Sequence, residues 1–494
     1  MRSSGSWLRW LSIGALLAAV GVTLLELAAY SQARANLPAQ MNVAGVPVGN
    51  LTPDQAENRL MEVYGSPIEI HYGNQVMYLS PSEFGFSLDL ESMLASADLD
   101  RTQDPFWIGF WNYLWGKPGQ AYSIPLKADY SGSQLSAAVA DIAARYDRPG
   151  IPPEPVPGSP TFSPGTPGTT LNQASAVDQI SSALLRGSGR RVDLPLSANT
   201  IPRPTANGLQ VLLKQIAQVD GYDGLMDLYM MDLQSGADMH IVSNEGQELA
   251  HNPDISFSAA STIKIGILVA AYRYLGSQMD APTQSLMQKM IALSDNPSTD
   301  SLMEEINLNR GPLLVTQMLS QIGLENTFLA GYFRDGAPLL QQFQTPANQR
   351  TDLNTTPDPY NQTTPSDMGA LLVDIYQCAE DNGGALRLTF PQVITQQDCQ
   401  DMINLLAQDN IGVLIQAGVP DGTRVAHKHG WITDAQGNIN YISDAAIVYT
   451  PGGNYVLCIY LWKDGGLDFD KDSKMVADLS RAVYNYFNPP TSSQ

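Results

Sequence analysis

The chain has 494 residues, of which 44% are hydrophobic and only 15% are charged. This is longer than one ordinary hydrophobic core, so the sequence predicts roughly two to four compact units. A formal net charge of -22 repels phosphate backbones and argues against a nucleic-acid partner. Five histidines, and three cysteines without metal-ligand spacing, give no basis for a metal site, and no organic cofactor is indicated.

The N-terminus predicts export. Arg2 and Arg9 stand at the start of a mostly apolar stretch over residues 8–30, which is close to the length that crosses a bilayer. We therefore expect residues 1–36 to be a signal anchor that contacts the membrane, or a signal peptide cleaved near Ala33. In the first case the protein is a single-pass cell-membrane protein with the rest of its chain outside the cytoplasm, and in the second it is secreted.

Short strands and helices are predicted next, up to a stiff Pro-rich boundary at residues 201–204. Thr52 before Pro53 is typical of a helix start, and this helix is expected to continue towards Tyr64. A hairpin is predicted around Gly73, between strands at 68–72 and 76–79. Two further helices are expected over residues 131–146 and 172–185.

A Gly- and Pro-rich segment over residues 149–168 has the composition of a linker, but its order argues otherwise. Its end, Phe162 to Gly168, is followed by a helix and then by the strand-like Val192 to Leu196. This order resembles the YoaR-like peptidoglycan-binding domain. The resemblance implies that residues 37–204 form one or more peptidoglycan-binding modules with an α+β fold.

Residues 205–494 predict a larger α+β or α/β unit. Strands occur near both of its ends, and a closing helix follows the last strand, which implies an antiparallel sheet flanked by helices with an all-helical subdomain inserted. The third cysteine, Cys458, falls in one of these strands and is expected to be buried. The predicted elements are a helix over 209–219, strands over 225–232, 238–242, 445–449 and 455–462, and a helix over 472–487.

Three short motifs within this unit predict acyl-transfer chemistry. Ser261 and Lys264 stand three residues apart at a predicted helix start, so the amine can lie near the hydroxyl and accept its proton during attack. Lys264 must be neutral to do so, and burial beside a second cation, for which Lys428 is the candidate, lowers a lysine pKa. Ser294 is then expected to pass the proton to the leaving amine.

Substrate-binding roles are predicted for residues of the second and third motifs. Asn296 is expected to donate a hydrogen bond to a substrate amide. The backbone N–H groups of Ser261 and Trp431 are expected to bind the developing oxyanion. Gly430 allows the substrate backbone to come close to the strand edge.

The order of the three motifs resembles that of class A β-lactamases. The resemblance rests on residues 257–265, 293–296 and 425–430, and on residues 363–368, which are similar to the start of the helix after the family's omega loop. It implies a catalytic Ser261, Lys264 and Ser294 as proton carriers, and Lys428 as the anchor for a substrate carboxylate. The implied substrate is a β-lactam or a peptidoglycan peptide, acylated onto Ser261 and hydrolysed, and hydrolysis of β-lactams would confer antibiotic resistance.

Two positions depart from the family pattern. His429 stands where the family carries a hydroxyl residue that helps to bind the carboxylate. Phe333 stands where the family carries the glutamate that activates the deacylating water. Asp335, Asp352 and Asp358 are the candidate replacements, each with an alternative interpretation as a turn residue.

Two rival functions stay open at this stage. A penicillin-binding D,D-peptidase forms the same acyl-serine but releases β-lactams slowly, and a wall-binding scaffold would have lost catalysis altogether. The pairing of Cys378 and Cys399 is also open, since a disulfide between them requires an oxidising compartment.

Overall fold

A computed structural model describes residues 6–117, 121–249, 254–433 and 437–490. The chain forms two compact units, the first made of residues 1–150 and 167–200 and the second of residues 151–166 and 201–494. The three sequence motifs, which include Ser261, Ser294 and Lys428, all lie in the second unit.

Unit 1 begins with the long apolar helix α1 (Ser6–Ala33). Residues Arg9–Ala33 have a mean hydropathy of 2.1 and form the one described helix that is long and apolar enough to cross a membrane. Helix α4 (Phe106–Leu114) packs beside the C-terminal end of α1, through the ring of Tyr30.

The rest of unit 1 contains two small α+β cores. In the first, the sheet β2-β1-β6 packs with helices α2 and α3, and Thr52 and Gln55 form the capping box that starts α2, as the sequence predicts. The elements of this core are β1 (Met41–Val43), β2 (Val46–Pro47), α2 (Pro53–Gly65), α3 (Leu90–Thr102) and β6 (Tyr122–Ile124).

In the second core, the sheet β4-β3-β9 is covered by helices α5 and α6, and the predicted hairpin around Gly73 is confirmed. Its elements are β3 (Ile68–Tyr72), β4 (Gln75–Leu79), η1 (Pro81–Phe84), α5 (Gly132–Tyr146), α6 (Gln173–Leu184) and β9 (Arg191–Asp193). Two strand pairs complete the unit, namely β5 (Ser87–Leu88) with β7 (Ala128–Asp129), and β8 (Thr169–Leu171) with β10 (Leu196–Ala198).

Residues 151–166, which composition marks as a linker, are ordered as two extended segments with isolated bridges between them. Phe162 is buried in the hydrophobic core of unit 2, and Asn485 donates a hydrogen bond to the carbonyl of Pro160. These contacts, rather than its Pro and Gly content, place the segment with unit 2 instead of with residues 37–150.

Unit 2 is built on an antiparallel six-stranded sheet in the order β13-β12-β11-β19-β18-β17. Its central strands are buried on both faces, so they read as nearly continuous apolar runs. The first and last segments of the unit pair directly, as the predicted sheet requires. The strands are β11 (Leu225–Asp232), β12 (Asp238–Asn244), β13 (Gln247–Glu248), β17 (Arg424–Thr433), β18 (Ile439–Tyr449) and β19 (Tyr455–Leu467).

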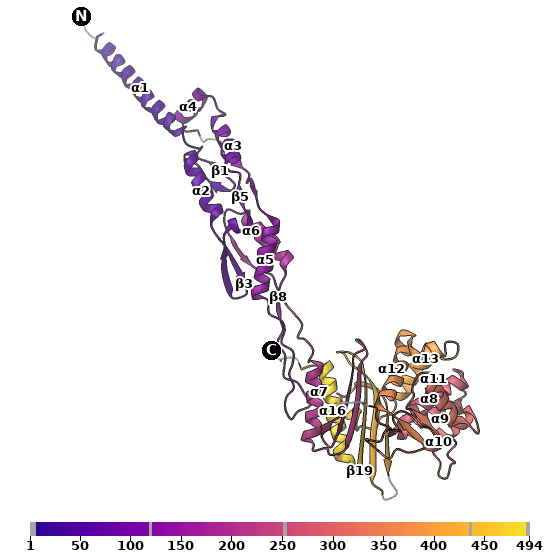
Figure 1. The fold of residues 1–494 in the computed structure, drawn as a ribbon. Coiled ribbons are helices and arrows are strands. Elements are labelled where there is room, and N and C mark those ends of the chain that lie inside the picture. Colours follow the sequence, from indigo (N-terminus) through magenta and orange to yellow (C-terminus); the bar gives the residue numbers. More distant parts are fainter. Residues whose placement is uncertain (1–5, 118–120, 250–253, 434–436, 491–494) are drawn as a thin grey trace. The chain divides into compact units, whose positions relative to one another are not determined.

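Helices cover both faces of this sheet (Figure 1). α7 (Ala206–Val219) and α16 (Phe469–Phe487) cover one face, and a larger group of helices covers the other. Side chains of β19 alternate between the two cores: Val456, Cys458 and Tyr460 face the larger helical group, and Leu457, Ile459 and Leu461 face α7 and α16.

The larger helical group is the predicted insertion. A disulfide joins Cys378 on α12 to Cys399 on α14, and Cys458 is free and buried. The elements are η2 (Ala260–Ile263), α8 (Lys264–Leu275), α9 (Ala281–Ala292), α10 (Asn296–Ile306), α11 (Gly311–Gln321), α12 (Pro365–Asp381), α13 (Gly384–Thr389) and α14 (Gln396–Leu406). The short helix α15 (Ile415–Gly418) instead packs against α16 on the other face of the sheet. A small sheet, β14 (Phe257–Ser258), β16 (Asn361–Thr363) and β15 (Phe328–Leu329), leads into η2.

Candidate active site

Ser261 lies on a sharp turn between strand β14 and helix α8. It belongs to the 3-10 turn η2, and the residue before it, Ala260, has a φ of 50°, a left-handed conformation that costs free energy for a residue with a Cβ. The Ser261 side chain is half-buried, and its hydroxyl makes no hydrogen bond to any described residue. The hydroxyl is therefore free to meet a substrate.

Lys264 is the first residue of α8 and is fully buried. Its ammonium group donates to the carbonyl of Ser294 at 2.6 Å, to Asn296 Oδ1 at 2.8 Å and to Ser294 Oγ at 3.3 Å. The structure thus brings together members of the first two sequence motifs. The expected direct contact between Lys264 and Ser261 is not among the hydrogen bonds that the described residues make.

The second motif presents its groups through a strained turn between α9 and α10. Ser294 has a φ of 54°, and its carbonyl faces the Lys264 ammonium group. Asp295 caps α10 by accepting the N–H of Ser298. Because Asn296 Oδ1 accepts from Lys264, its amide NH₂ is left to donate to a substrate.

Electrostatics favour a neutral Lys264. Burial, and then the positive charge of Lys428, lowers the pKa of Lys264 from 10.5 to about 7, while Asp295, Asp300 and Asp409 act in the opposite direction. A lysine with this pKa is substantially neutral near pH 7, which is the state that accepts a proton from a serine hydroxyl.

The third motif forms one edge of the site. A Cβ added at Gly430 would lie 2.8 Å from the backbone nitrogen of Ser261, so strand β17 approaches the nucleophile as closely as a glycine allows. The N–H of His429 points away from β18 and donates to Asp409 at 3.2 Å. Since alternate residues of a strand point the same way, the N–H of Trp431 also faces this edge, where an oxyanion donor is expected.

Lys428 forms a buried ion pair with Asp409. Its ammonium group lies 3.1 Å from Asp409 Oδ2, and His429 Nδ1 donates to the same oxygen at 2.7 Å. Burial lowers the pKa of Lys428, with Asp409 opposing. Burial also disfavours the charged form of Asp409, but the His429 hydrogen bond and the charge of Lys428 leave the pKa of Asp409 lowered.

A second buried pair holds Asp409 in place. His427 lies between the Asp409 carbonyl, 2.5 Å from its Nε2, and Asp444 Oδ1, 2.9 Å from its Nδ1. A carbonyl oxygen only accepts, so Nε2 is the donor there. The predicted carboxylate anchor, Lys428, is therefore already paired with a fixed carboxylate before any substrate binds.

Phe333 covers Lys264 from the omega-loop side. The Lys264 ammonium group lies 5.2 Å from the centroid of the Phe333 ring. The loop backbone is fixed by Asp300 on α10, which accepts the N–H groups of Phe333 at 2.8 Å and Arg334 at 2.9 Å. An apolar ring thus occupies the place that the resemblance assigns to a carboxylate.

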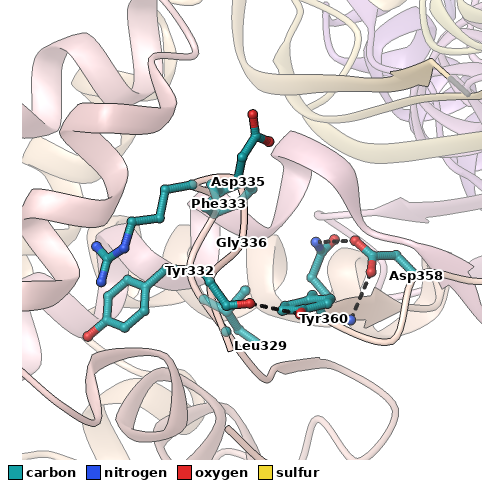
Figure 2. Close-up of a pocket in the computed structure, with 11 residues that line it drawn as sticks. Leu329, Tyr332, Phe333, Asp335, Gly336, Asp358 and Tyr360 are labelled. Carbon is teal, nitrogen blue, oxygen red and sulfur yellow. Dashed lines mark hydrogen bonds between the residues drawn. The ribbon is translucent and has the colours of Figure 1, made fainter. Parts of the chain in front are cut away.

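The loop encloses a cavity of about 290 Å³ beside Phe333 (Figure 2). Asp358 lies in its wall, where it accepts hydrogen bonds from the N–H of Tyr360 and from Asn361 Nδ2, and burial raises the pKa of Asp358. Asp335 also lines the cavity and is exposed, with its carboxylate directed away from Asp358 in Figure 2.

Neither Asp335 nor Asp358 makes a hydrogen bond to Ser261, and the third candidate base, Asp352, is paired with another residue. Asp352 is ion-paired with Arg350 at 2.6 Å, and the hydrogen bond from Arg350 lowers the pKa of Asp352 to about 2. Among the described residues, no hydrogen bond or ion pair joins Asp335, Asp352 or Asp358 to Lys264. In the described part of the chain, none of the three predicted bases therefore joins the cluster of Lys264, Ser294 and Asn296.

Two carboxylates that contact the candidate site residues were not predicted from the sequence. Asp409 and Asp300 lie outside the three motifs, and only the folded chain brings them to Lys428 and to the Phe333 loop. Asp300 has a weak signal, since it follows Asn296 by four residues on one helix and so faces the same side. Asp409 has none, because it lies in the loop after α14.

Residues 209–281 and 274–487 match the family described as Beta-lactamase enzyme family. The match covers more than half of the chain, so this protein belongs to that family. No curated protein sequence matches the chain significantly.

Solved structures similar to this chain include a protein named PBP-A, with 23% identity and a TM-score of 0.42 over 59% of this chain and 100% of that one. An acyl-enzyme complex of a PBP-A mutant with penicillin G has 21% identity and a TM-score of 0.40, over 59% and 100%. An ancestral class A β-lactamase of Gram-negative bacteria has 21% identity and a TM-score of 0.40, over 56% and 99%.

Proposed function

We propose that unit 2 is a serine hydrolase whose Ser261 is acylated by a β-lactam or by the related amide of a peptidoglycan peptide. The observation that carries this proposal is the buried Lys264, hydrogen-bonded to both Ser294 and Asn296 beside the free Ser261 hydroxyl. Neutral Lys264 takes the Ser261 proton as Oγ attacks the carbonyl carbon. Ser294 then delivers its hydroxyl proton to the departing nitrogen and takes the proton held by Lys264, whose ammonium group lies 3.3 Å from Ser294 Oγ. The N–H groups of Ser261 and Trp431 hold the oxyanion.

The acyl-enzyme is expected to be long-lived. Release needs a water molecule and a base near the ester, but the Phe333 ring lies on Lys264 where the resemblance expects a glutamate. This favours a slow-release penicillin acceptor or D,D-peptidase over a rapid β-lactamase. A decayed scaffold is disfavoured, because it has no need to keep an ammonium group buried and paired.

One experiment separates these functions. The protein is incubated with a fluorescent penicillin and with a chromogenic cephalosporin, and we expect persistent labelling with little colour. Ser261→Ala must abolish labelling, whereas Ser320→Ala, the same change at an exposed serine on α11, must leave it intact. Fast colour change would establish a β-lactamase instead, and no labelling of the native chain would refute acyl chemistry.

Cell-surface placement accompanies this proposal. The Cys378–Cys399 disulfide fits an oxidising compartment, and α1 has the length of a membrane anchor. We further propose that residues 37–150 and 167–200 of unit 1 bind peptidoglycan, on the basis of the resemblance of residues 37–204 to wall-binding domains. Co-sedimentation with purified sacculi tests this: the chain should pellet with sacculi whether or not Ser261 is replaced, and failure to pellet would refute wall binding.

A further inference from the structure

Helix α4 carries a row of exposed aromatic residues that the acyl chemistry does not use. The helix spans Phe106–Leu114 and contains no charged residue. Trp107 and Trp111 are 69% and 59% exposed, and Trp115, directly after the helix, is 67% exposed. A spacing of four residues places all three on one face. Three exposed tryptophans in one row are unusual for a surface that faces only water.

The opposite face of α4 is packed against the end of α1. The Tyr30 ring centroid lies 5.3 Å from that of Phe106, 5.5 Å from that of Phe110 and 5.3 Å from that of Tyr113. A Cβ at Gly109 would overlap the Tyr30 hydroxyl, so the two helices approach closely there. The exposed row is therefore held in a fixed place relative to α1.

Polar contacts fix the same junction. Arg34 donates to the carbonyl of Asp104 at 2.7 Å and lies over the Phe106 ring, 5.3 Å from its centroid. Arg101 donates to the carbonyl of Arg34 at 2.5 Å. These bonds hold the segment before α4 against the residue that follows α1.

The place where α4 contacts α1 indicates what covers the three exposed tryptophans. The apolar stretch Arg9–Ala33 ends within three residues of Tyr30, so a bilayer crossed by α1 has its headgroup region at this level. Tryptophan favours that region, because its ring is apolar and its N–H needs a polar partner. Helix α4 carries no charged side chain that would oppose insertion of its aromatic face at this depth.

We propose that α4 lies in the headgroup region of the bilayer at the C-terminal end of α1, with Trp107, Trp111 and Trp115 inserted among the lipids. The occupant of this surface is the lipid interface and not a second copy of the chain. The inference goes beyond the acyl chemistry, and it requires only that α1 stays in the membrane. Such a second contact restricts how unit 1 rotates and tilts about its single anchor.

The test uses the full chain in vesicles of phosphatidylethanolamine and phosphatidylglycerol that carry lipids brominated at either a shallow or a deep position. A fluorescent probe is attached at Trp111→Cys, and in separate chains at Leu17→Cys in the middle of α1 and at Tyr78→Cys on β4. These three positions are similarly exposed, at 59%, 64% and 66%. The native cysteines do not compete, because they are disulfide-bonded or buried.

We expect the probe at residue 111 to be quenched most by the shallow bromines and the probe at residue 17 most by the deep ones. The probe at residue 78 should be quenched by neither. Replacing Trp107 and Trp115 with Ser should reduce quenching at residue 111 towards the value at residue 78, without changing penicillin labelling of Ser261.

An unquenched probe at residue 111 overturns the proposal, and the probe at residue 17 then shows whether α1 itself had inserted. Excimer emission from pyrene at residue 111, diagnostic of two adjacent copies, also overturns it. Because Ser261 labelling is measured on the same samples, failure of this proposal is distinguished from failure of the acyl chemistry.

Discussion

The pH dependence of acylation follows directly from the environment of Lys264. Proton transfer from Ser261 requires the neutral amine, and the pKa of Lys264 is lowered to about 7 by burial and by Lys428. With that pKa the neutral fraction is about 9% at pH 6 and about 91% at pH 8. The acylation rate should therefore rise about tenfold over this interval and then level off. An unperturbed lysine with a pKa near 10.4 would give a rise of about one hundredfold and no plateau.

The assay is single-turnover labelling by a fluorescent penicillin at several pH values, with the protein in excess so that release does not contribute. Lys428→Gln should move the midpoint to higher pH, because it removes the second cation and leaves the negative charge of Asp409 unopposed. Lys474→Gln is the matched control, since this lysine is 72% exposed and paired with Asp478 on α16.

Only the position of the midpoint is diagnostic, since Lys428→Gln also weakens substrate binding. A profile that is flat between pH 6 and 8 would show that Lys264 is not the proton acceptor. A profile that still rises tenfold per unit above pH 8 would show that the pKa of the acceptor is not lowered to about 7. An unchanged midpoint in Lys428→Gln would show that the two ammonium groups are not coupled.

Three further outcomes are expected. Phe333→Glu should shorten the lifetime of the acyl-enzyme by about 10²-fold or more, because it places a general base beside the ester. Phe333→Gln, which removes the ring but supplies no base, should shorten it much less, and the decay of fluorescent label measures both. Asp409→Asn should lower the KM for anionic β-lactams, because it releases Lys428 from its ion pair; an unchanged KM would mean that the pair does not compete with substrate. Removing the Cys378–Cys399 bond by a double Ser substitution should cost about 3 kcal/mol of unfolding free energy, because the disulfide closes a loop of 21 residues, and denaturant unfolding measures this cost.

Local signals explain why most of the elements were predictable from the sequence. Thr52 and Pro53 start α2 through contacts within one turn, and the paired strands of unit 2 have apolar runs on both sides of turn residues. The segment at residues 151–166 was harder, because Pro and Gly content does not report that Phe162 is buried in unit 2.

The candidate site was likewise predictable from the sequence only in part. Lys264, Ser294, Asn296 and Gly430 converge as their motifs predict, since the first two motifs lie at helix starts and the third lies within strand β17, and the hydrophobic pattern determines how these elements pack. The partner of Lys428 was not predictable. Asp409 reaches it from a loop, and no sequence period places a loop carboxylate opposite a buried strand lysine.

Helix α10 contacts both Lys264, which is expected to act in acylation, and the Phe333 loop, which is expected to limit deacylation. Its first residue, Asn296, binds Lys264, and Asp300, one turn later, holds the Phe333 backbone with one carboxylate oxygen for each of two N–H groups. Asp300→Asn replaces one acceptor by a donor, so one loop N–H loses its partner at a cost of about 1–3 kcal/mol. The Phe333 ring is then expected to leave Lys264 and admit water.

Asp300→Asn should therefore release the acyl group faster while labelling of Ser261 persists, which separates loop position from acylation. Glu304→Gln is the control, because Glu304 contacts the same loop only through the exposed side chain of Arg334. If the acyl-enzyme lifetimes of the two variants equal that of the native chain, the Phe333 ring does not limit release. Slow release would then come from the lack of a base alone, a cause that only Phe333→Glu corrects.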